Sequence, residues 1–193
     1  MVYTSDMLLK EFDAWCRERF AIEAMAKADP GMNGVQVGRL EKEVKRVAFA
    51  VDACLESFKR AAAWQADLLV VHHGLYWGSP YPLTGPAYER INFLCEKNLA
   101  LYAMHLPLDA HPDLGNNIGL ARLLGLEDLE PFGTWRGVSI GFKGRLQRPL
   151  RLEEIAIKAF GDYRTTLGRL PFGKEDIRTV GIVSGGAPDD VSQ

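Results

Sequence analysis

The chain has 193 residues, a formal net charge of −2 and 47% hydrophobic residues, values typical of a globular protein. Disorder over most of the chain is therefore excluded, and 23 basic against 25 acidic residues give no reason to expect nucleic acid or an acidic membrane as partner. The sequence shows neither a secretory signal pattern nor an apolar run that could cross a bilayer. Three widely spaced cysteines exclude a disulfide scaffold or zinc ribbon, so we expect a cytoplasmic protein.

The first half of the chain predicts alternating helices and strands. Residues 7–25 carry apolar side chains at helical spacing and predict an amphipathic helix, and turn residues at 29–31 and 33–34 predict a loop after it. Strand–helix–strand–helix–strand order follows and is typical of a parallel sheet with right-handed crossovers. The elements in this order are strands at 47–51, 68–71 and 99–104 and helices at 53–65 and 87–97.

The second half predicts a helix at 116–124, a strand at 137–143, a helix at 152–160 and a strand at 178–184. A stretch rich in glycine and arginine marks the start of a second lobe. We therefore expect an α/β fold, with a parallel-sheet core and flanking helices (αβα), plus a second, smaller α/β portion. The predicted domains are a metal-binding α/β domain of residues 1–130 and the start of an incomplete second portion, residues 131–193.

All four histidines lie between positions 72 and 111. His72 and His73 directly follow one predicted strand, and His105 follows the next, with Asp109 four residues later. The carboxyl ends of parallel strands line the ligand crevice of an open sheet, so we expect these side chains, and Asp52 from the first strand, at one edge. Imidazole and carboxylate ligands together suit Zn, Fe, Mn, Ni or Co. The pattern thus predicts a divalent metal site.

Within such a site, the adjacent His72 and His73 should point in opposed directions, so that each could serve a different ion with Asp109 shared between them. Two ions would activate a water and clamp the attacking and leaving oxygens. His105 is a candidate for a role beside the metal, holding a ligand or a water. Spacing alone leaves a structural alternative open, in which the histidines only form hydrogen bonds within the fold and Asp109 caps a helix or a turn. His111, before a proline in a loop, is expected to face solvent.

Aromatic side chains gather in the glycine- and proline-rich loop after the histidine pair. They are Tyr76, Trp77 and Tyr81. These rings could stack on a flat base or ring, or they could pack as a lid or an oligomer contact. The sequence leaves both interpretations open.

Four short stretches carry a family resemblance: Pro-Gly-Met-Asn-Gly-Val-Gln-Val-Gly at 30–38, Val-His-His-Gly at 71–74, His-Leu-Pro-Leu-Asp-Ala at 105–110 and Gly-Asn-Asn at 115–117. They resemble the Nif-three-like dinuclear-metal family, the GTP cyclohydrolase type 2 homologues, from about residue 8 to the last predicted strand. The resemblance implies three metal ligands and one neighbouring histidine. His72 and His73 would bind different ions, Asp109 would be the third ligand, and His105 would lie beside the centre.

The resemblance also implies that Asn33 and Gln36 lie near the same cleft, although Asn-Gly equally predicts a plain turn. Members usually continue further and complete the site with a His-x-x-x-Glu stretch. The present sequence has no histidine after His111, so we expect that C-terminal portion to be missing from it. A complete centre would hold two ions per chain, and an incomplete one would hold one or none.

The sequence therefore predicts a metal-dependent hydrolase with a one- or two-ion divalent centre. By resemblance, its small-molecule substrate would be a nucleotide such as GTP. The alternative is a non-catalytic metal-binding adaptor or regulatory protein. The resemblance further implies a homo-oligomer, a hexamer built as a trimer of dimers, whereas neither a membrane nor nucleic acid is expected as a partner.

Overall fold

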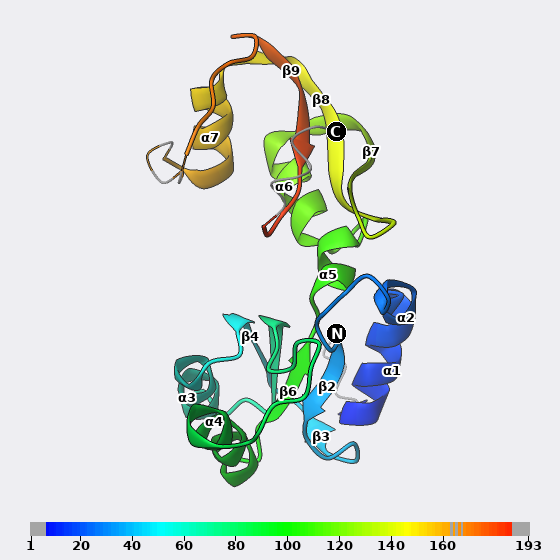
Figure 1. The fold of residues 1–193 in the computed structure, drawn as a ribbon, viewed down its shortest axis with the longest axis vertical. Helices are drawn as coiled ribbons and strands as arrows, with labels where there is room; N and C mark the ends of the chain where they lie inside the picture. The colour runs from blue at the N-terminus through cyan, green and yellow to red at the C-terminus, as the bar shows by residue number, and fades with distance from the viewer. Residues whose placement is uncertain (1–6, 163, 165, 167, 187–193) are drawn as a thin grey trace, which may run out of the picture. The chain divides into compact units, whose positions relative to one another are not determined.

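The computed structural model describes residues 7–162, 164, 166 and 168–186 (Figure 1). The chain divides into two compact units, one as far as Pro107 and the other from Leu108 on. The sequence places this division at residue 130 instead. The structural boundary lies earlier because the helix that follows it belongs to the core of the second unit, where Ile118 and Leu124 pack in one cluster with Phe142.

A four-stranded sheet of order β2-β6-β5-β4 forms the centre of the first unit. Strands β4 (Val47–Asp52), β5 (Leu68–His73) and β6 (Ala100–Ala103) run parallel, as the order of elements predicts. Strand β2 (Gly34–Val37) pairs antiparallel with β6, where the sequence predicts only a loop. Four residues with a register shift give no alternation of apolar and polar side chains, so no pattern announces this strand.

Helices cover both faces of this sheet and give the predicted αβα arrangement (Figure 1). Helices α3 (Leu55–Ala63) and α4 (Gly85–Glu96) pack on one face. On the other face lies α1 (Leu9–Arg19), whose Phe12 meets Tyr102 edge-on at a centroid distance of 5.2 Å. The buried side chains between α3, α4 and the sheet include Phe58, Leu69, Val71, Leu94, Leu99 and Leu101.

The single helix expected at 7–25 is two helices in the structure. Helix α1 ends at Arg19, and α2 covers Ile22–Met25. Ala21 between them has a φ of 47°, a left-handed conformation that interrupts the helix. Before and after this pair, the short strands β1 (Met7–Leu8) and β3 (Glu43–Val44) pair antiparallel. None of the helices in the described residues has the length and apolar character needed to cross a membrane.

The second unit is built on a three-stranded antiparallel sheet, β7-β8-β9. Its strands are β7 (Leu126–Trp135), β8 (Val138–Leu150) and β9 (Ile177–Ile182), and its helices α6 (Asn116–Leu124) and α7 (Leu152–Phe160) lie where the sequence predicts them. The expected mixture of helices and strands is therefore confirmed. Strand β7 has no counterpart among the predicted elements, and β8 extends well beyond the predicted strand.

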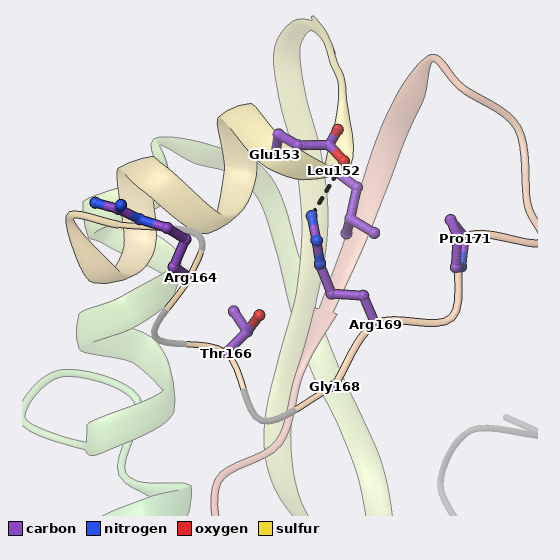
Figure 2. Close-up of a pocket in the computed structure, with 7 residues that line it drawn as sticks. All are labelled: Leu152, Glu153, Arg164, Thr166, Gly168, Arg169 and Pro171. Atoms are coloured by element: carbon purple, nitrogen blue, oxygen red, sulfur yellow. Dashed lines mark hydrogen bonds and ion pairs between the residues drawn. The ribbon is translucent and has the colours of Figure 1, made fainter.

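A surface pocket of about 570 Å³ lies in the second unit, next to the start of α7 (Figure 2). Glu153 of α7 pairs there with Arg169, with 3.3 Å between Oε1 and Nη1. The other described lining residues are Leu152, Arg164, Thr166, Gly168 and Pro171. This lining offers no histidine or cysteine, so it does not match the metal chemistry that the sequence predicts.

Candidate metal centre

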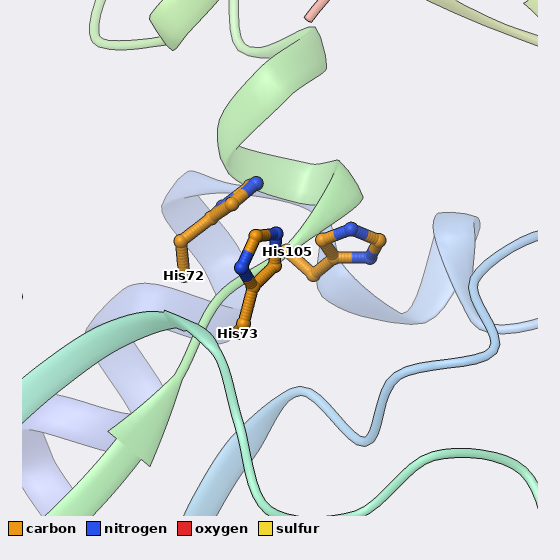
Figure 3. A group of neighbouring side chains, drawn as sticks. All are labelled: His72, His73 and His105. Atoms are coloured by element: carbon orange, nitrogen blue, oxygen red, sulfur yellow. The ribbon is translucent and has the colours of Figure 1, made fainter. Parts of the chain in front are cut away.

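Three histidines meet at the carboxyl edge of the first sheet (Figure 3). His72 and His73 end β5, and His105 is the second residue after β6. The ring centroid of His72 lies 4.7 Å from that of His73 and 4.9 Å from that of His105. One potential ligand atom from each ring can be chosen so that all three lie within 4.8 Å of one another. Imidazole nitrogens at this spacing are suited to hold a divalent ion.

The two adjacent histidines are oriented by the strands on either side of β5. His72 Nδ1 lies 3.0 Å from the carbonyl oxygen of Met104, which follows β6. His73 Nδ1 lies 2.7 Å from Asp52 Oδ1, at the end of β4. These hydrogen bonds tie the two rings to the strands on opposite sides of β5, and both rings lie at one edge of the sheet. A carbonyl and a carboxylate only accept hydrogen bonds, so each ring donates from Nδ1, and Nε2 is the nitrogen that a metal would take.

The third histidine is held by a buried carboxylate that the sequence analysis missed. His105 Nδ1 lies 2.8 Å from Oδ1 of Asp29, whose side chain is completely buried. The same carboxylate accepts hydrogen bonds from Gly31 N at 2.8 Å, Asn33 Nδ2 at 2.7 Å and Leu106 N at 3.0 Å. Asn33 adds a second restraint, because its Oδ1 accepts a hydrogen bond from His105 N at 2.7 Å. Both the backbone and the ring of His105 are thus fixed by one loop.

Asp29 is negatively charged at neutral pH. Burial acts to raise the pKa of its carboxyl group, but hydrogen bonds from His105, Asn33 and Gly31 N–H outweigh it and hold the pKa below the ordinary 3.8. The sequence signals this residue only through Asp-Pro-Gly, which predicts a turn. The turn is present, since Gly31 N bonds the carboxylate two residues earlier.

Gln36 holds the loop that follows the histidine pair. Its Oε1 accepts a hydrogen bond from Leu75 N at 2.6 Å, and its Nε2 donates to the carbonyl oxygen of Met32 at 2.7 Å. A Cβ at Gly74 would run into the Gln36 amide and would lie 2.7 Å from Cβ of Ala103. The glycine of the His-His-Gly stretch therefore leaves the space that this bridge occupies.

Asp109 lies in the second unit, in α5 (Leu106–Ala110). The residue is 2% exposed, and its Oδ1 accepts a hydrogen bond from Asn116 Nδ2 at 2.9 Å. Asn117 Nδ2 donates to the Asp109 carbonyl oxygen at 3.3 Å. Two asparagines of the Gly-Asn-Asn stretch thus hold this residue in place. Its role as the third metal ligand stays a prediction.

The expectation that His111 faces solvent is wrong, because only 6% of this residue is exposed. Its Nδ1 accepts hydrogen bonds from the backbone N–H groups of Asp113 at 3.0 Å and Leu114 at 3.1 Å. The ring therefore closes the turn that follows it. A proline after the histidine predicts a loop but does not reveal that the imidazole folds back onto it.

The model of the family described as Duf34/NIF3 (NGG1p interacting factor 3) matches residues 7–193. The chain belongs to the Duf34/NIF3 family. A Deinococcus radiodurans protein named GTP cyclohydrolase 1 type 2 homolog is 42% identical over 186 residues, which cover 95% of this chain and 68% of that protein. An Archaeoglobus fulgidus protein of the same name is 49% identical over 164 residues, covering 85% and 64%.

Among solved structures, that of TTHA1606 from Thermus thermophilus is similar to this Duf34/NIF3 chain, with a TM-score of 0.69 and 39% identity. The match covers 79% of this chain and 60% of the Thermus chain. The present chain thus spans between 60% and 68% of the length of these three relatives. The resemblance expected from the four short stretches is confirmed.

Proposed function

We propose that the three histidines form a divalent metal centre and that this chain is a metal-dependent hydrolase acting on a nucleotide. The observation that carries the proposal is the hydrogen bonding of the rings. Each Nδ1 is bound to a carbonyl or carboxylate oxygen, which is the arrangement that orients metal-binding histidines in proteins. The nucleotide is supported by the names of the relatives, GTP cyclohydrolase 1 type 2 homologs.

The residues present fit a divalent ion. His72, His73 and His105 would hold it, and a set of imidazoles suits Zn, Fe, Mn, Ni or Co. Asp52 and Asp29 place negative charge behind two of the rings, which increases the basicity of the ligand nitrogens. The spread of the ligand atoms is compatible with one ion or with two neighbouring ions.

A divalent ion held by this group would supply Lewis acidity, which lowers the pKa of a water molecule and polarises a bond. The residues of the chain supply orientation, because Asp29 and Asp52 accept hydrogen bonds from Nδ1 of His105 and His73 and keep these rings from turning. The two carboxylates differ in access, since the side chain of Asp52 is 65% exposed and that of Asp29 is buried. Trp77 flanks the group on one side, because its indole ring lies 4.9 Å from His105 and 5.9 Å from His73 between centroids.

The first experiment is elemental analysis of the full chain, purified without chelator or nickel resin, beside the variant His72→Ala/His73→Ala. We expect about one or two ions per chain in the wild type and a large loss in the variant. The control is Glu56→Ala/Arg60→Ala, which removes an exposed ion pair on α3 and should keep the metal. Absence of bound metal in the wild type would refute the metal centre.

The second experiment tests the reaction. The metal-loaded wild type should hydrolyse GTP or a simple phosphoester faster than the double histidine variant, whereas the α3 control should match the wild type. Bound metal without turnover above the histidine variant would refute the hydrolase. That outcome would favour a non-catalytic metal-binding protein. A change of oligomeric state on addition of metal would support this alternative.

A further inference from the structure

The loop after β5 holds an aromatic ring against the histidines. Trp77 Nε1 donates to the carbonyl oxygen of Gly74 at 2.9 Å, and its backbone forms an isolated bridge with Gly31. On either side, Met32 N donates to the Tyr76 carbonyl oxygen at 3.1 Å, and Gly78 N donates to the Pro30 carbonyl oxygen at 2.8 Å. The indole is therefore fixed in position although 41% of the residue is exposed. Its contacts with two of the histidines make it one wall of the candidate centre.

The same indole is also a wall of a separate pocket in the first unit. This pocket has a volume of about 330 Å³, at the lower end of the range for small-molecule sites. Tyr81 provides a second ring, and its hydroxyl is held by a hydrogen bond to the carbonyl oxygen of Leu75 at 3.0 Å. The lining comprises Gly74, Leu75, Trp77, Tyr81, Ala87 and Arg90. Trp77 therefore borders both the histidine group and the pocket, and Gly74 of the lining directly follows His73.

Arg90 gives the pocket a positively charged side chain. Its Nε donates to the carbonyl oxygen of Pro86 at 3.2 Å, and its Nη1 lies 3.5 Å from that of Ala53. No acidic side chain among the described residues forms an ion pair with it. The two carbonyls orient the half-buried guanidinium and leave its charge available, and a guanidinium in that state favours a phosphate or carboxylate group.

We propose that this pocket is the anion-binding subsite of the histidine centre. Arg90 pairs with a phosphate group of the ligand, and the indole of Trp77 packs against its flat ring. The inference rests on the proposed function for its nucleotide substrate and adds to it the residues that recognise the substrate. The structural alternative for the aromatic loop is that its rings only pack against each other, and that alternative predicts no effect of ligand charge.

Calorimetric titration of the full chain, treated with chelator, tests the subsite independently of the metal. The probes are guanosine monophosphate, guanosine and inorganic phosphate. We expect the monophosphate to bind at least ten times more tightly than guanosine to the wild type, and Arg90→Gln to remove most of this difference. Arg39→Gln, which deletes an equal charge from an exposed position in the same unit, should change affinity less than twofold. Unchanged melting temperature and circular dichroism show that Arg90→Gln is folded, and Arg90→Lys should recover part of the affinity.

The ring contact has its own readout. Binding of the monophosphate should quench tryptophan fluorescence in the wild type and do so far less in Trp77→Phe. Equal affinities of the wild type and Arg90→Gln, or of the monophosphate and guanosine, would overturn the subsite even if the protein binds metal. Binding that depends on Arg90 in a chain that never holds metal would support the subsite and refute the proposed hydrolase. Tight binding of inorganic phosphate alone would keep Arg90 as the anion partner and overturn the part assigned to Trp77.

Discussion

The variant Asp29→Asn should weaken both the fold and the histidine group, because one buried carboxylate accepts four hydrogen bonds. Its Oδ1 accepts from Gly31 N and His105 Nδ1, and its Oδ2 accepts from Asn33 Nδ2 and Leu106 N. Asparagine keeps the shape but replaces one oxygen by an amide that donates. Two of the four donors therefore lose their acceptor whichever way the amide turns.

The size of the effect follows from this count. A buried donor without an acceptor costs about 1–3 kcal/mol, so two such donors would cost about 2–6 kcal/mol. The His105 side chain is 18% exposed and its ring can exchange tautomers, which reduces the cost. We expect a loss of about 2–4 kcal/mol in the free energy of unfolding. Reversal of the tautomer would put the ring proton on Nε2, so metal affinity should fall by about 10–100-fold.

Urea unfolding of chelator-treated protein at pH 7 measures the first effect, and competition with a metal-binding dye measures the second. The matched control is Asp52→Asn. The Asp52 carboxylate also lies 2.7 Å from a histidine Nδ1, that of His73, but its side chain is 65% exposed. This control should weaken metal binding while changing stability by less than about 1 kcal/mol. If Asp29→Asn unfolds at the same urea concentration as the wild type, the reasoning from buried donors is refuted.

Three further predictions follow. The stability that the Asp29 carboxylate contributes is fully present above its ordinary pKa of 3.8 and is lost as pH falls through the lower pKa of the folded state. In urea unfolding at acid pH, the free energies of unfolding of the wild type and Asp29→Asn should therefore converge. Gly74→Ala should lower the melting temperature because the added Cβ has no room, whereas Gly119→Ala on α6 has open space and should be neutral or stabilising. Iodoacetamide should alkylate the exposed Cys54 well before the buried Cys16. Hydrogen bonds with a nearby serine lower the pKa of the Cys54 thiol, whereas burial raises that of Cys16 to about 12. Equal alkylation rates by mass spectrometry would contradict this prediction.

The central strands could be predicted because burial leaves a plain signal in the sequence. The four residues Leu68–Val71 of β5 are all buried, which gives a continuous apolar run. Strand β7 gives no such signal, because its residues 127–131 are all exposed and a register shift interrupts its pairing. Propensity and periodicity therefore locate elements in the core, while antiparallel strands at the surface depend on partners far along the chain.

The same distinction applies to the candidate site. His72, His73 and Asp52 could be predicted because each lies at the end of a parallel strand, and topology alone brings strand ends together. Asp29 could not, because its bonds to His105 and Leu106 span 76 and 77 residues, and only a local turn is visible in the sequence. Asp29, which orients His105 from a loop, therefore leaves a weaker pattern than the residues at strand ends.

The acceptors that orient the three histidines come from separate parts of the first unit. Asp52 ends β4, the carbonyl of Met104 follows β6, and Asp29 lies in the loop between α2 and β2. An unfolded chain brings none of these groups to the histidines, so the ligand geometry exists only when the sheet and this loop are assembled. An ion bound by the group must then favour the folded state over the unfolded one, and metal binding and stability of the first unit should rise and fall together.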